Sequence, residues 1–65
     1  MDRMDELVTA AVRQGFIVRQ TKRGAWMFRR GTVTVTVVAT PERARDWIAL
    51  IGALRGAGLV FPPGK

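Results

Sequence analysis

Hydrophobic and polar positions recur with two different periods along the chain, and these periods divide it into successive elements. Over residues 2–14 the apolar positions return every three or four residues, which predicts a helix; they are Met4, Leu7, Val8, Ala11 and Val12. Residues 16–20, 25–30 and 32–37 are short runs rich in β-branched and aromatic side chains. Each run predicts a strand, and residues 32–37 alternate most strictly, threonine with valine.

A second helix is expected after the strands. Thr40 is a suitable N-cap, Pro41 suits the first helical position, and Glu42 lies in the first turn. The expected core stripe is again apolar at helical spacing and consists of Ala44, Trp47, Ile48, Ile51 and Leu54. We expect this helix to end over Arg55–Gly58, where glycines interrupt the pattern.

The order of these elements predicts an α+β fold. Two helices and three strands in the order αβββα most simply form a three-stranded antiparallel sheet with both helices packed on one face. Residues 1–58 account for this single domain, and a chain of 65 residues has no room for a second one. Residues 59–65 then form an apolar, proline-containing C-terminal tail.

The turn at Gly31 admits two registers for the second hairpin. A two-residue turn can begin one residue before Gly31 or at Gly31 itself, and Phe28 then lies opposite Val33 or Val35. Both registers put Phe28 and Trp26 on the valine face, under the helices. We therefore expect Trp26 to pack in the core and not to stack on nucleic-acid bases. The opposite, open face carries the threonines together with Ala25, Met27 and Arg29.

Basic residues outnumber acidic ones, which points to an anionic partner. Eleven Lys and Arg against five Asp and Glu give a net charge of +6, and seven of the eleven lie between residues 19 and 45. Such a cluster attracts phosphates regardless of base sequence. The expected nucleic-acid contacts are Arg19, Lys22, Arg23, Arg29, Arg43 and Arg45. The alternative is an arginine-rich surface that is only solvated.

The composition removes most catalytic chemistry. The chain has no His, Cys, Ser or Tyr, so it lacks thiolate and imidazole metal ligands and a serine nucleophile. We expect no catalytic site, no metal and no cofactor. No apolar stretch approaches the ~20 residues of a membrane span. The first residues have no apolar core typical of a signal peptide, so we expect a cytoplasmic protein without a membrane partner.

The chain carries a set of short motifs: Gly15-Phe16 at the end of the first helix, Val35-Thr36-Val37, the ending Ala57-Gly58-Leu59, and the segment from Gln20 to Arg30. This set resembles the pattern of HicA-type toxins, which are small mRNA interferases of toxin–antitoxin pairs. The resemblance covers nearly the whole chain. It implies an αβββα fold similar to a double-stranded-RNA-binding domain, and an antitoxin-like partner.

The chain departs from that family at the catalytic motif. The family carries Gly-Ser-His at the start of the second strand, where this sequence reads Arg23-Gly24-Ala25 or, in the other alignment, Gly24-Ala25-Trp26. The open-face position favours Ala25 in place of the histidine. Since the chain holds no other histidine, the nuclease chemistry of the family does not carry over.

Three functions from different classes follow. The first is a catalytically inactive HicA-like protein that binds RNA or another nucleic acid through phosphates. The alternative is a protein-interaction module, phage- or mobile-element-encoded, that binds and inhibits a host protein. An enzyme with an unrecognised mechanism is the third and least favoured. The apolar tail residues Leu59, Val60 and Phe61 are expected either to fold back over the helices or to contact a partner, with a homodimer favoured.

Overall fold

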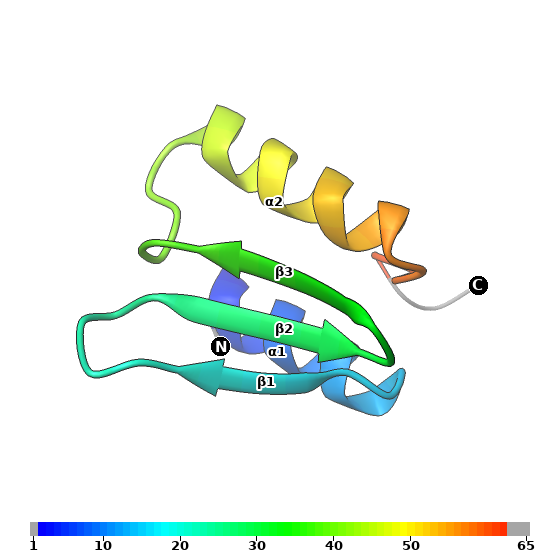
Figure 1. Cartoon of the computed structure of the whole chain (residues 1–65). Coiled ribbons are helices and arrows are strands. Elements are labelled where there is room, and N and C mark those ends of the chain that lie inside the picture. The colour runs from blue at the N-terminus through cyan, green and yellow to red at the C-terminus, as the bar shows by residue number, and fades with distance from the viewer. Residues whose placement is uncertain (1, 63–65) are drawn as a thin grey trace.

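The chain folds into two helices and a three-stranded antiparallel sheet, as the sequence predicts. The computed structural model describes residues 2–62. Along the chain the elements are α1 (Arg3–Arg13), β1 (Ile17–Gln20), β2 (Trp26–Arg30), β3 (Val33–Val37) and α2 (Ala44–Gly56) (Figure 1). The predicted αβββα order is therefore confirmed.

The sheet has the order β1-β2-β3, so β2 is central and both other strands are edges. In the second hairpin Phe28 lies opposite Val35 and Trp26 opposite Val37. This is the register of a turn that begins at Gly31, whose φ of +62° favours glycine. Of the two registers that the sequence allowed, the turn chemistry at Gly31 selects this one.

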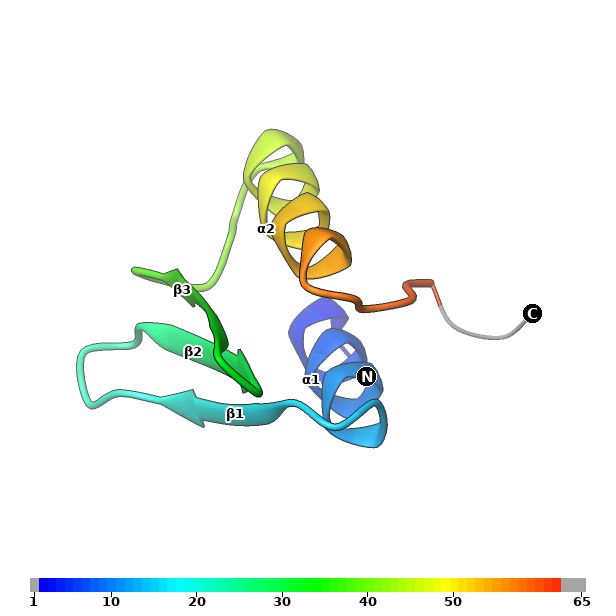
Figure 2. The ribbon, with the colours of Figure 1, turned by 45° about the vertical axis from the view of Figure 1, so that its right-hand side comes forward.

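Both helices lie on the same side of the sheet (Figure 2). The core between the layers is built around three fully buried side chains, Leu7 of α1, Phe28 of β2 and Leu54 of α2. Trp26 packs against this core and donates its Nε1–H to Thr40 Oγ1 at 2.8 Å. The expectation that Trp26 packs in the core is confirmed.

The predicted start of the second helix is wrong. Helix α2 begins at Ala44, with Arg43 at the N-cap and no side-chain hydrogen bond capping it. Thr40, the expected N-cap, instead accepts the hydrogen bond from Trp26. Because this hydroxyl anchors the loop to β2, the chain stays outside the helix until Arg43, and Pro41 lies buried in the connection.

The core stripe of α2 also differs from the predicted one. Leu50 is 4% exposed and Leu54 is fully buried, whereas Ile48 is 71% exposed. Trp47 and Ile51 are half-buried against the same core. The observed set 47, 50, 51 and 54 follows the same helical spacing as the predicted one. Because α2 is apolar on several sides, the pattern alone could not select its buried face.

In α1 the predicted stripe is right for four of its five members. Met4, Leu7 and Ala11 are buried and Val8 packs beside them, but Val12 is exposed. Ala10 is buried in addition. Ala10 is small enough to be buried at the margin of the stripe. The buried face of α1 is therefore rotated slightly about the helix axis, toward Ala10 and away from Val12.

Each helix ends in the same left-handed glycine cap. In α1, Gly15 has a φ of +94°, and the next residue, Phe16, donates its N–H to Ala11. In α2, Gly58 has a φ of +102°, and Leu59 donates to Leu54. These are Schellman motifs, in which the residue after the glycine makes an apolar contact with the helix. The repeated Gly-apolar pair therefore explains why Phe16 and Leu59 are both buried.

The described part of the tail, residues 59–62, folds back over the molecule. Leu59 belongs to the core, while Val60 is 63% exposed. Gln14 holds the backbone of Val60 in both directions: its Nε2 donates to the carbonyl and its Oε1 accepts from the N–H, each at 2.8 Å. Arg55 donates to the carbonyl of Phe61. Residues 63–65 of the predicted tail lie outside the described residues.

Candidate nucleic-acid interface

The face of the sheet that points away from the helices is formed by alternate residues of all three strands. Cross-strand partners share a face, and the pairs on this side are Ile17 with Arg29, Arg29 with Thr34, Arg19 with Met27, and Met27 with Thr36. All six residues are exposed. The predicted open face is thus confirmed, with Arg19 and Arg29 lying diagonally across β1 and β2.

The first hairpin presents two more cations at its tip. Gly24 donates its N–H to the carbonyl of Thr21 at 3.0 Å and has a φ of +92°. Thr21 in turn donates to the carbonyl of Ala25 at 2.8 Å and accepts the N–H of Ala25 on its side chain at 3.0 Å. These bonds define a tight three-residue loop. Lys22 and Arg23 are exposed within it.

Four exposed cations on the open face and its hairpin loop form a region of positive charge, which we call the basic sheet surface. They are Arg19, Lys22, Arg23 and Arg29. No Asp or Glu occurs from Leu7 through Pro41, so the sheet and its loops contain cations without any acid. Guanidinium groups suit phosphate oxygens, with which they form paired hydrogen bonds. The arrangement therefore forms an exposed, positively charged face.

Arg43 and Arg45, the other two predicted contacts, lie in a different electrostatic setting. Both are exposed at the start of α2, toward the end of the sheet where the first hairpin loop also lies (Figure 1). Glu42 and Asp46 flank them along the chain. The two acids offset the two arginines, so the start of α2 adds little net attraction for phosphates.

Arg30 lies on the helix side and contacts its own chain. Its Nη1 donates to the carbonyl of Gly58 at 3.3 Å, and its guanidinium carbon lies 5.6 Å from the centroid of the Phe16 ring. Alternation along β2 could have revealed this placement, because Arg30 is two residues from the buried Phe28. Arg30 therefore joins the two helix ends and is not part of the basic sheet surface.

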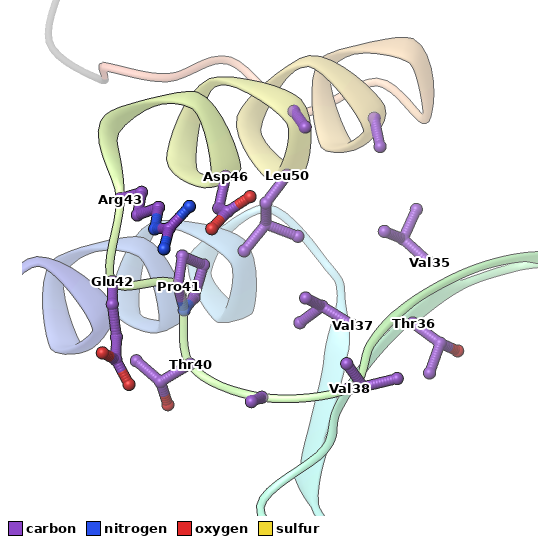
Figure 3. A pocket seen from close by; sticks show the side chains of 13 residues that line it. Val35, Thr36, Val37, Val38, Thr40, Pro41, Glu42, Arg43, Asp46 and Leu50 are labelled. Carbon is purple, nitrogen blue, oxygen red and sulfur yellow. The ribbon is translucent and has the colours of Figure 1, made fainter.

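A groove of about 520 Å³ separates β3 from α2 (Figure 3). Val35 and Val37 of β3 line one wall, and Ala49, Leu50 and Ala53 of α2 line the other. Arg43 and Asp46 lie at the end nearest the start of α2. The sequence reasoning missed this groove, because its width depends on how α2 sits beside the sheet edge.

Ala25, which stands where the resemblance to HicA-type toxins places a histidine, precedes β2 by one residue. It is half-buried, and alternation assigns it to the same face as Met27. The observed αβββα topology is compatible with a HicA-like fold. In the alignment that places Ala25 at the family's histidine, a methyl group stands in place of the imidazole.

No protein-family model matches the chain, and neither does any curated protein or solved structure. Within residues 2–62, no group of three or more acidic, histidine or cysteine side chains is arranged to hold a metal ion. No helix of this part of the chain has the length and apolar character needed to cross a bilayer. The case for a function therefore rests on the geometry of this chain alone.

Proposed function

We propose that this protein binds nucleic acid through phosphates with its basic sheet surface, and does not cleave it. The observation that carries the proposal is the grouping of Arg19, Lys22, Arg23 and Arg29 on the open face and its hairpin, with no acid from residue 7 to residue 41. Four exposed cations on elements that contain no acid gain from contact with a polyanion, whose condensed counterions they release.

The geometry of the open face supports phosphate contacts more than base readout. Arg19 and Arg29 are diagonal neighbours across β1 and β2, a spacing of about 7–8 Å between backbones. Their mutual repulsion is relieved when each guanidinium holds a phosphate. The hydroxyls of Thr34 and Thr36 are exposed beside them and supply further donors. None of the paired strand residues on this face is aromatic, so within residues 2–62 the face offers no ring on which bases could stack.

We expect purified protein to leave total RNA intact. The chain has no His, Cys, Ser or Tyr, and Ala25 stands where the HicA-type toxins carry histidine. Proton transfer by a positioned side chain is typically worth about 10²–10⁴-fold in rate, and arginine does not supply it near neutral pH. Gel analysis of RNA after prolonged incubation provides the measurement. Cleavage at defined positions, persisting through nuclease-free purification, would contradict this expectation.

Binding to duplex RNA is expected to be sequence-tolerant and to weaken steeply with salt. Three to five phosphate contacts predict a slope of about −2 to −4 when the logarithm of the association constant is plotted against the logarithm of the salt concentration. Replacing Lys22 and Arg23 together by Ala removes two of those contacts. We expect weaker binding to every sequence alike and a slope smaller in magnitude by about 1.5, measured by fluorescence anisotropy over a salt series.

The matched control is the double substitution Arg43→Ala and Arg45→Ala. It lowers the net charge by the same two units, but at the start of α2, where Glu42 and Asp46 lie. We expect a clearly smaller change in slope. Equal effects of the two double variants would show that only net charge matters, and the proposed surface would then be wrong. A salt-tolerant, saturable complex with a single host protein would instead favour the alternative function of host-protein inhibition.

A further inference from the structure

The outer edge of β3 is less protected by charge than the outer edge of β1. From Gly31 through Pro41 the sequence contains no charged residue, whereas the opposite edge strand, β1, carries Arg19. Natural proteins usually guard exposed edges with charge, proline or a covering element. Among the described residues the strand order leaves β3 unpaired on its outer side, and its flank toward α2 is an open groove.

The backbone groups available at this edge belong to Thr34 and Thr36. A two-residue hairpin turn is closed by a hydrogen-bonded pair, here Arg30 with Val33. Hydrogen-bonded pairs recur at every second residue, so Val35 and Val37 also bond β2. The N–H and C=O groups of Thr34 and Thr36 consequently point outward. Within residues 2–62 no backbone hydrogen bond outside the helices and strands uses them.

The sequence of β3 is palindromic about its central residue. It reads Val-Thr-Val-Thr-Val from Val33 to Val37. When this strand pairs with itself antiparallel about Val35, Thr34 of one copy faces Thr36 of the other, and every valine faces a valine. The two residues of each Thr34–Thr36 pair both have outward backbone groups, so the register forms hydrogen-bonded pairs without any rearrangement. β-branched and Thr–Thr cross-strand pairs are favourable in sheets.

We propose that the β3 edge is a self-association surface, on which a second copy of this chain adds its own β3 antiparallel, centred on Val35. The result is a continuous six-stranded sheet with two-fold symmetry. Since a two-fold axis perpendicular to the sheet keeps faces together, both basic sheet surfaces then lie on one side. This pairing is independent of nucleic-acid binding, although it would double the cationic face.

The groove beside β3 has the shape and lining that this partner requires. The inward side chains of a paired strand are its valines, which would enter the space between Val35, Val37 and the α2 residues Leu50 and Ala53. Alanines on α2 leave that space open (Figure 3). Five of the residues that line the groove on β3 and α2 are apolar, which suits valines better than charged side chains; they are Val35, Val37, Ala49, Leu50 and Ala53.

The expected association is weak and strengthens with salt. Pairing of two five-residue strands is a small interface, of the size found in transient complexes, below about 1,200 Å² in total. Each copy carries a net charge of +6, and salt screens the repulsion between copies. The salt dependence therefore has the opposite sign to that of nucleic-acid binding, which separates the two proposals experimentally.

The test uses charge pairs across the proposed two-fold axis. In the double variant Thr34→Lys/Thr36→Lys, lysine faces lysine twice. We expect the protein concentration at which half of the chains are dimeric to rise about tenfold. In Thr34→Lys/Thr36→Glu, lysine faces glutamate twice, and association is expected to match or exceed that of the parent. Both positions are exposed on the open face, so the fold should tolerate either pair, which far-UV circular dichroism checks.

Sedimentation velocity from micromolar to millimolar concentration gives the midpoints. The control Ile17→Lys/Gln20→Lys adds the same two charges to exposed positions of the opposite edge strand and should weaken association much less. A parent protein that is monomeric throughout would overturn the proposal, and so would an equal loss in the Lys/Lys and Lys/Glu variants. Recovery in the Lys/Glu variant supports this register specifically, because registers that pair Thr34 with itself would not produce it.

Discussion

Replacing Phe28 by Ala is expected to abolish cooperative folding. Phe28 is fully buried at the centre of the middle strand and belongs to one core cluster with residues of both helices. Such a truncation typically costs about 3–5 kcal/mol. A core in a chain this small rarely supplies more than about 3–5 kcal/mol in all. The loss therefore equals the whole margin, and a melting curve followed by circular dichroism should show no transition.

The neighbouring residue on the same strand provides the control. Met27 points to the open face and is 40% exposed, so Met27→Ala should change the free energy of unfolding by no more than about 0.5 kcal/mol. Both substitutions remove a large apolar side chain from β2, and only the face differs. If Phe28→Ala melts within a few degrees of the parent, the core is not organised around β2 as described.

The alternation of buried and exposed positions along a strand, as at Phe28 and Met27, is also what made the sheet predictable from the sequence. Strict alternation in residues 32–37 and a single turn glycine restricted the second hairpin to two registers, and both gave the same faces for Trp26 and Phe28. Face assignment needs only the parity of positions, which local sequence contains. For the same reason Arg29 could be assigned to the open face of the sheet.

The predictions from sequence were wrong at positions where a tertiary contact selects one of several locally possible conformations. Thr40-Pro41-Glu42 has the composition of a helix start, but the hydrogen bond from Trp26 fixes the Thr40 hydroxyl elsewhere. In α2, apolar residues lie on several sides, and only packing against the sheet selects Leu50 over Ile48. The groove beside β3 follows from that same packing. The hydrophobic periodicity of a single sequence does not determine how α2 is positioned against the sheet.

The charged residues of the candidate site also divide into features that the sequence predicts and features that only the structure shows. Sequence reasoning could identify every cation, because charge and exposure are readable from composition and alternation. The sequence also shows the two acids beside Arg43 and Arg45, and alternation puts Arg30 on the helix side, but neither reveals that the guanidinium of Arg30 lies over the ring of Phe16. What the structure adds is therefore the contact that separates Arg30 from the basic sheet surface.

Truncation after Gly58 is expected to lower the melting temperature by about 10–20 °C. The deletion removes Leu59, which is 3% exposed and completes the cap of α2 through its bond to Leu54. Burial of one leucine is worth about 1.5–3 kcal/mol, and each kcal/mol shifts the melting temperature of a domain this size by about 4–8 °C. The two hydrogen bonds between Gln14 and Val60 are lost as well.

Single substitutions separate the core contribution from the rest of the tail. Leu59→Ala should reproduce most of the destabilisation, while Val60→Ala, at a 63% exposed position whose backbone bonds are unchanged, should have little effect. The mass of the truncated protein in solution, measured alongside, tests the predicted role of residues 59–61 in a homodimer. A dimer that survives truncation is held elsewhere, and β3 is the surface proposed for it. If the truncated protein keeps both its melting temperature and its oligomeric state, the tail is a passive extension and the hypothesis that it stabilises or joins the chains is wrong.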